Sequence, residues 1–435
     1  MHRTTRRRLA PILLFTAGSL ILGACSSSSK SADTTVAAGA DTTAAPGVET
    51  TAVGAIDTTV AGAATTVAGA ADTTVAGAAE TTLAAATGNT GGADRVAAFR
   101  TALTALPFSE PISAVPKAKK VYYVQCSVSA CTEIKVGIEA AAKALGWTFE
   151  SSVHKDTPDT VAAAFDAAIA AKPDVVLTSG NPREWFAPQL KTLADAKIPV
   201  VAWSLPEGYE PGNGISANLL TNDDYYFYGV LMADWVATTT KTKHVMFVGL
   251  PTFPVLSTVQ TGFKEEIARV CPDCKVETFE VAVTDLGTNL PGQMVSKLQA
   301  DKQLDTVAYA FGGMLFGVPD ALKAADLLAQ STAISQAGGP MNFAFINNGE
   351  HQAAEVGLAS ELLGWRALDV AARLLSGGTA GKSTPPTAAS VDGHPDILVN
   401  GLPLQILQKG DIKDATALWP GVEGFQAQFK KLWGV

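Results

Sequence analysis

The feature that most constrains this chain is a regular alternation of short, apolar, β-rich runs with amphipathic stretches, which begins at Lys119. The first set predicts helices at 133–145, 157–171 and 185–196, and strands at 120–125, 147–154, 174–178 and 199–203. Thr157 is a suitable N-cap for the second helix, with Pro158 at its first position. Unbroken apolar strands separated by amphipathic helices indicate a parallel sheet covered on both faces.

A second set follows the turn-rich stretch 206–214. It predicts helices at 222–238, 257–270, 288–300, 319–329 and 364–375, and strands at 244–250, 275–283, 306–311 and 342–347. The two sets give about nine parallel strands, which is too many for one comfortable open sheet. We therefore predict an α/β fold of two Rossmann-like lobes, each built on a parallel sheet.

Four segments stand in an order and spacing that match a known family. They are 172–182 (KPDVVLTSGNP), 196–203 (AKIPVVAW), 215–224 with the helix 225–235, and 362–377. From about Lys117 to the C-terminus, the chain resembles type I periplasmic binding proteins of the ribose-binding class. The resemblance implies two lobes joined by a three-stranded hinge, with crossings near 215–221, 356–362 and 396–401.

The resemblance also implies a domain order and a function. We expect a lead-in at 94–116, lobe 1 at 117–214, lobe 2 at 222–355, a return to lobe 1 at 362–395, and a C-terminal crossing with the lobe 2 edge at 396–435. Such a protein captures a small solute between its lobes and delivers it to the permease of an ABC importer. The alternative is a ligand-sensing domain that reports to a membrane receptor, and an enzyme on the same fold is a third, less favoured one. We expect a monomer.

The first residues indicate export and anchoring. Residues 1–8 carry four arginines and 9–22 form an apolar run too short to span a bilayer, as in a signal peptide. The run ends in Leu-Gly-Ala-Cys25, which resembles the lipobox of bacterial lipoproteins. That likeness implies cleavage after residue 24, lipidation of Cys25 and an extracytoplasmic, membrane-anchored protein; an ordinary signal peptide with a chance cysteine is the alternative. Residues 26–93, rich in Ala and Thr, predict a disordered tether.

Four further cysteines form two close pairs, Cys126 with Cys131 and Cys271 with Cys274. In an oxidising compartment this spacing predicts two local disulfides. Cys271-Pro-Asp-Cys274 could also be a redox motif. A redox CxxC opens a helix after a strand, whereas this pair closes a predicted helix, so a structural clip is favoured.

Ligands of open parallel sheets bind beyond the carboxyl ends of the strands. The strand ends therefore give the candidate ligand-binding residues: Cys126, Ser127, Asn181, Arg183, Trp185, Trp203, Ser204, Thr252, Phe253, Phe311, Met314, Asn347 and Asn348. Trp185 could equally be the first core residue of its helix, and Phe311 and Met314 are of a type found more often in the core. Sugar-binding members of the family usually have Asp, Asn and Arg at these ends. Their scarcity here predicts a less charged, more aromatic cleft, for a sugar or a less polar small molecule.

Other function classes are disfavoured. The net charge of −9 and the absence of a basic stripe argue against a nucleic-acid partner. Residues 376–383 resemble a P-loop and 212–217 a dinucleotide fingerprint, but neither lies between a strand and a helix as those motifs require. We find no catalytic constellation, so we expect no enzyme activity, no metal site and no cofactor.

Overall fold

The computed structural model describes residues 92–206, 212–379 and 402–435. The predicted signal peptide at 1–25, nearly all of the predicted tether at 26–93 and the predicted third crossing at 396–401 lie outside the described residues. In the part that the structure describes, no helix is both long enough and apolar enough to cross a membrane.

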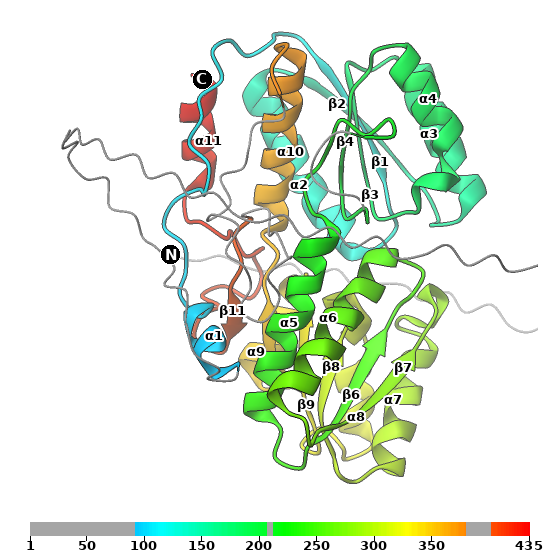
Figure 1. Ribbon diagram of the computed structural model, residues 1–435, viewed down its shortest axis with the longest axis vertical. Helices are drawn as coiled ribbons and strands as arrows, with labels where there is room; N and C mark the ends of the chain where they lie inside the picture. Colours follow the sequence, from blue (N-terminus) through cyan, green and yellow to red (C-terminus); the bar gives the residue numbers. More distant parts are fainter. Residues whose placement is uncertain (1–91, 207–211, 380–401) are drawn as a thin grey trace, which may run out of the picture. The chain divides into compact units, whose positions relative to one another are not determined.

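The first lobe is built on a five-stranded parallel sheet in the order β2-β1-β3-β4-β5 (Figure 1). Its strands are β1 Lys120–Gln125, β2 Thr148–Val153, β3 Val175–Ser179, β4 Val200–Trp203 and β5 Ala217–Asn218. Strand β1 is apolar on both faces because helices cover both. Val121 and Tyr123 belong to the core that includes α2 (Ser129–Leu145), and Tyr122 and Val124 to the core that includes α3 (Pro158–Ala171) and α4 (Ala187–Asp195).

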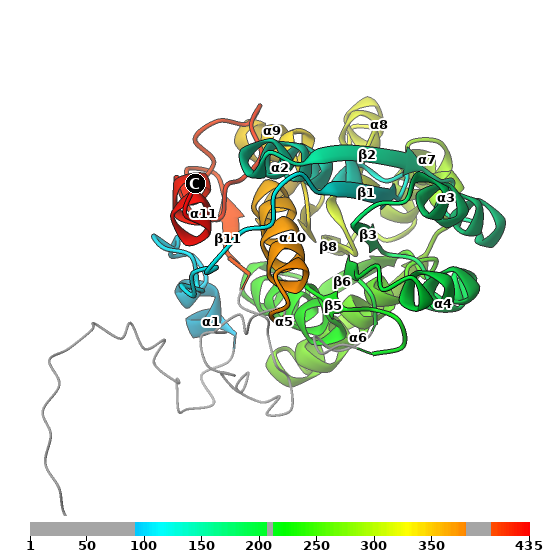
Figure 2. The same cartoon turned by 90° about the horizontal axis from the view of Figure 1, so that it is seen from above.

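The second lobe is built on a six-stranded sheet in the order β11-β10-β9-β8-β6-β7. Its strands are β6 His244–Gly249, β7 Lys275–Glu280, β8 Leu304–Tyr309, β9 Thr332–Gln336, β10 Gln352–Val356 and β11 Ile406–Gln408, the last antiparallel to β10. Its helices are α5 Asn222–Thr239, α6 Pro254–Val270, α7 Asn289–Ala300, α8 Val318–Ala324 and α9 Pro340–Asn348. The chain leaves the first sheet after β5 and returns from β10 to α10 (Ser360–Leu375), which packs on α2 (Figure 2). The predicted class, α/β with two parallel-sheet lobes, is confirmed.

One predicted strand is wrong. Residues 342–347 lie inside helix α9, whereas β9 and β10 on either side of it are strands that the sequence did not predict. Pro340 opens α9 and Gly349 closes it in the left-handed conformation, while Asn342, Phe343 and Ile346 form its buried face. A short apolar run fits either period, and here the caps decide for a helix. A smaller difference lies at 185–196, where a 3-10 turn (Arg183–Trp185) precedes the shorter α4.

Each lobe contains a pair of helices that approach closely at glycines. A Cβ atom on Gly229 of α5 would lie 2.6 Å from the backbone nitrogen of Phe263 in α6. In the same way, a Cβ on Gly364 of α10 would lie 2.6 Å from the backbone oxygen of Ile134 in α2. Backbone atoms cannot rotate away as side chains do, so only glycine allows these helices to pack at this distance.

Gly229→Ala is therefore expected to lower the free energy of unfolding by about 2 kcal/mol, because the added methyl forces α5 and α6 apart. The control is Gly292→Ala on α7, where an added Cβ meets nothing within 4 Å. That change should instead raise the free energy of unfolding by up to about 1 kcal/mol through helix propensity. Urea denaturation of both variants measures the difference, and equal effects of the same sign would contradict the close packing.

Two terminal segments lie side by side along both lobes (Figure 1, Figure 2). Helix α1 (Ala93–Ala98) packs on α5 of the second lobe, and the next residue, Phe99, accepts a hydrogen bond from the backbone of Ile406 in β11 at 2.8 Å. Further along, Phe108 packs on Phe429 of α11 (Phe425–Trp433), a helix that contacts α10. The sequence predicted none of α1, β11 and α11. Through these three elements the terminal segments contact α5 and β10 of the second lobe and α10 of the first.

Candidate ligand-binding cleft

A cavity lies between the two lobes at the carboxyl ends of the strands. The space in it that is open to a water-sized molecule amounts to about 60 Å³. The first lobe contributes Cys126, Val128, Ala130, Cys131, Ile134, Ser179, Gly180, Trp203 and Ser204; the second contributes Tyr225, Phe253, Val255, Leu256, Phe311, Gln336 and Ala337; Leu358 comes from the return crossing. Neither lobe forms this cavity alone, so its shape depends on how the lobes meet.

Aromatic side chains make up much of the cavity wall. Trp203 ends β4 and is only 1% exposed, with its ring centroid 5.3 Å from that of Tyr123 beneath it. Phe253 and Phe311 come from the opposite lobe. A Cβ on Gly180 would lie 3.6 Å from the Phe253 ring, so the first lobe presents bare backbone to that ring. The cavity thus offers flat apolar surfaces to a bound molecule.

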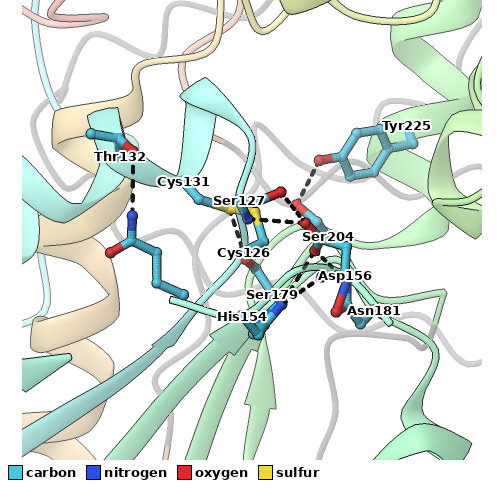
Figure 3. Close-up of a disulfide and its surroundings, with 11 residues drawn as sticks. Cys126, Ser127, Cys131, Thr132, His154, Asp156, Ser179, Asn181, Ser204 and Tyr225 are labelled. Atoms are coloured by element: carbon cyan, nitrogen blue, oxygen red, sulfur yellow. Dashed lines mark hydrogen bonds and ion pairs between the residues drawn. A yellow bond between two sulfur atoms is a disulfide. The ribbon is translucent and has the colours of Figure 1, made fainter. Parts of the chain in front are cut away.

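Ser204 and Tyr225 join the two sides of the cavity through their hydroxyl groups (Figure 3), which lie 2.6 Å apart. Burial raises the pKa of Tyr225, so its hydroxyl stays protonated and can donate or accept a hydrogen bond. Ser204 has a φ of 60° and Ala337 on the other wall has a φ of 53°. Left-handed backbone at non-glycine residues is costly and concentrates where a site requires a particular geometry.

The loop after β1 is held by a disulfide and a polar network (Figure 3). Cys126 is bonded to Cys131 at the start of α2, and a second disulfide joins Cys271 to Cys274 after α6. Asp156 accepts hydrogen bonds from the Ser127 backbone nitrogen at 3.0 Å and from the Asn181 amide at 3.0 Å. Burial lowers the pKa of the adjacent His154, and Asp156 partly opposes this shift. These contacts fix the wall of the cleft and already occupy the side-chain nitrogen of Asn181.

A second cavity adjoins the first, and the two share Val128 and Phe311 in their walls. Ser127, Ser129 and Glu133 line it from the first lobe, and Gly339, Met341 and Asn342 from the second, with Phe316 exposed nearby. Burial raises the pKa of Glu133, and the Ser360 hydroxyl, which donates a hydrogen bond to it at 3.3 Å, partly opposes this. The second cavity is therefore more polar than the first.

The structure brings six of the predicted ligand-binding residues to these cavities. They are Cys126, Ser127, Trp203, Ser204, Phe253 and Phe311. Seven others lie outside both linings: Asn181, Arg183, Trp185, Thr252, Met314, Asn347 and Asn348. Their positions explain why.

Trp185 packs against the outer core of the first lobe, and Met314 is fully buried in a 3-10 turn. Asn347 and Asn348 were chosen as the end of a strand, but they end helix α9, where Asn347 donates a hydrogen bond to the backbone of Ile412 at 3.3 Å. Arg183 lies in the 3-10 turn after β3, and Thr252 is half-buried ahead of α6.

The polar side chains of the cleft that sequence reasoning missed include Tyr225, Gln336 and Glu133. Gln336 is the last residue of β9, so the same strand-end rule would have found it had β9 been predicted. Tyr225 and Glu133 lie near the N-terminal ends of helices α5 and α2, where no strand-end signal exists. In the described residues, no group of three or more His, Cys, Asp or Glu side chains is placed to hold a metal ion.

Two lobes with parallel sheets and a cavity between them at the strand ends define the type I periplasmic binding proteins. A family model described as "periplasmic binding protein domain" matches residues 124–379, more than half of the chain, and the chain belongs to this family. Membership implies an extracytoplasmic location. A comparison with curated proteins finds no match.

Solved structures share the fold at low sequence identity. A glucose-galactose binding protein from Geobacillus stearothermophilus is 18% identical with a TM-score of 0.56, over 68% of this chain and 100% of that one. An ABC transporter solute-binding protein from Actinobacillus succinogenes 130z with bound D-allose is 15% identical with a TM-score of 0.56, over 68% and 99%. The arabinose-binding component of an ABC transporter from Shewanella sp. ANA-3 is 20% identical with a TM-score of 0.52, over 60% and 86%.

Proposed function

We propose that this protein is an extracytoplasmic substrate-binding lipoprotein that captures a small solute between its lobes and delivers it to an ABC importer. The observation that supports this most is the cavity at the strand ends, whose walls come from both lobes. A solute bound there touches both lobes at once and so favours the closed arrangement. A transporter can then distinguish loaded from empty protein by the position of the lobes. The relatives named above are described as binding sugars, and a sugar is one candidate solute here.

A bound solute should stabilise the purified protein, by about 2.7 kcal/mol at 100 times its dissociation constant. We expect Tyr225→Phe to weaken binding about fivefold, because it removes one hydroxyl from the cavity wall and leaves the ring in place. Tyr122→Phe is the matched control, since Tyr122 belongs to the core on the outer side of the first sheet. A thermal-shift screen followed by titration measures both variants. Equal losses in the two would remove Tyr225 from the site.

Delivery to an importer has its own test. Deleting the gene should abolish uptake of the solute that the purified protein binds. Normal uptake in the deletion strain, together with a lost response to the same solute, would instead support a sensor.

We propose that Cys25 carries the lipid, on the strength of its sequence context. Two acyl chains suffice for stable anchoring, so Cys25→Ala should move the protein from the membrane fraction to the soluble extracytoplasmic fraction. Retention of the Cys25→Ala protein in the membrane fraction would contradict a lipid anchor at this residue.

A further inference from the structure

The cleft carries negative charge and no positive charge among the described side chains that line it. Among the described residues that line the two cavities there is one charged side chain, Glu133, and no lysine, arginine or histidine. Glu133 accepts a hydrogen bond from Ser360, and no basic side chain of the described chain forms an ion pair with it. A partly buried carboxylate without a cation nearby is unfavourable, and burial raises the pKa of Glu133 accordingly. A positive charge in the cleft would relieve this.

Glu133 lies against groups of the second lobe that do not supply a cation for it. A Cβ on Gly339, at the start of α9, would collide with the Glu133 carboxylate, so that carboxylate lies directly against the second lobe. Glu355 of β10 lies behind the same loop and accepts a hydrogen bond from the Gly338 backbone nitrogen at 2.5 Å. Burial raises the pKa of Glu355 to about 8, and repulsion from Glu133 adds to the rise, so Glu355 is largely protonated at neutral pH. The groups that face Glu133 are thus a hydroxyl, a glycine backbone and a second carboxyl.

The neighbouring cavity wall is suited to a cation for a separate reason. The rings of Trp203, Tyr225, Phe253 and Phe311 line the first cavity, and Phe311 also lines the second, next to Glu133. Aromatic faces carry negative partial charge and attract ammonium groups, most strongly where water is excluded. The same rings bury an apolar or aromatic body.

Gln336 supplies an acceptor that the protein leaves unused. Its side-chain nitrogen donates to the backbone oxygen of Ala310 at 2.7 Å, which fixes the orientation of the amide. Its side-chain oxygen is buried and has no hydrogen-bond partner among the described residues, although Gln336 lines the cavity. Buried acceptors are normally satisfied, so this oxygen calls for a donor from a bound molecule.

We propose that the cleft takes a small cationic amine with an apolar or aromatic body. The ring or chain lies among the aromatic side chains, the ammonium group is attracted to Glu133, and a donor of the ligand satisfies Gln336. Anionic solutes such as carboxylates and phosphates are disfavoured, because no basic side chain lines either cavity in the described chain. This inference rests on the proposed function, since it names the solute class of the same cleft.

The test compares amines with neutral molecules of the same shape. Calorimetric titration of the mature protein with phenethylamine and tryptamine, against 2-phenylethanol and tryptophol, should show the amines binding at least tenfold more tightly. Glu133→Gln should weaken the amines at least tenfold and leave the alcohols unchanged. Glu139→Gln is the control, because Glu139 lies on the same helix and outside both cavity linings. Equal affinity for amine and alcohol would overturn the proposal.

A second readout needs no variant. An ammonium group favours the ionised form of Glu133, whose pKa is raised above 4.5. Amine binding to the native protein at pH 5 should therefore release protons, and its heat should depend on the ionisation enthalpy of the buffer. Alcohol binding should show no such dependence. If glucose, ribose or allose binds and the amines do not, the amine proposal fails and the solute-binding function stands. If no solute of any class binds, the proposed function fails with it.

Discussion

Replacing Arg95 by alanine is expected to destabilise the folded protein by about 3 kcal/mol. Arg95 of α1 reaches two carboxylates of the second lobe, Asp234 of α5 at 2.6 Å and Glu266 of α6 at 2.8 Å. Both carboxylate side chains are fully buried, and Arg269 also pairs with Glu266 at 2.5 Å. Without Arg95, Asp234 and Glu266 lose a cation that they share in a buried environment, and the ionised form of Asp234 becomes more costly.

The loss of stability caused by Arg95→Ala should grow as pH rises. Burial and the neighbouring Glu266 raise the pKa of Asp234 to about 8, while Arg95 opposes that rise. Arg95→Ala removes the opposing charge, so the pKa of Asp234 rises further and its ionisation at high pH costs more stability. Urea denaturation at pH 6 and pH 9 measures this. Lys191→Ala, which breaks an exposed pair with Asp195, is the control and should cost less than about 1 kcal/mol. A similar small cost for Arg95→Ala would contradict the buried pairing.

The stability of the protein should also fall as pH rises from 5 to 9, largely because of Glu355. This carboxyl lies on β10, and burial raises its pKa from the ordinary 4.5 to about 8. Hydrogen bonds from Ser335, Gly338 and Gln352 lower the pKa and so partly oppose this rise. The folded state therefore holds a proton that the unfolded chain loses near pH 4.5. Glu355 thus contributes stability that is complete below that pH and is lost as pH rises through about 8.

The difference between the two pKa values of Glu355, 4.5 and about 8, corresponds to roughly 5 kcal/mol of folding free energy. This is the largest effect of pH that we expect. Glu355→Gln has no proton to lose and should reduce the slope of stability against pH. A residual slope remains because Asp234 titrates in the same direction. Urea midpoints of the native protein and Glu355→Gln between pH 5 and pH 9 provide the measurement. Parallel pH curves for the two proteins would show that Glu355 is ionised throughout.

Local signals predicted most of the fold. Strand β1 matches its predicted range, and α3 begins where the pair Thr157 and Pro158 placed it, because caps and apolar runs act over a few residues. The same rules failed between 332 and 356. Strand β9 ends in Ser335 and Gln336, polar residues that are buried only because Glu355 and the backbone of Ala310 bond them from neighbouring strands. No local sequence pattern predicts hydrogen bonds to such distant partners.

The site was less predictable than the fold. The strand-end rule found Trp203, Phe253 and Phe311, since the ends of parallel strands meet at one edge. It also proposed Asn181, which Asp156 binds within the loop network. It could not find Tyr225 or Glu133, which come from helices of opposite lobes and face the cleft only because of how those lobes meet. The scarcity of charge in the cleft was predicted from sequence. The position of its single carboxylate was not.

The central claim is that the cavity between the lobes binds one small solute. Calorimetric titration of the mature protein with the best ligand from the screen tests it most directly. The account predicts saturable binding of one molecule per chain, with a negative heat-capacity change from burial of the aromatic walls and weaker binding in Tyr225→Phe than in Tyr122→Phe. Absence of saturable binding across amines, sugars, nucleosides and polyols, or binding that neither variant alters, would contradict it.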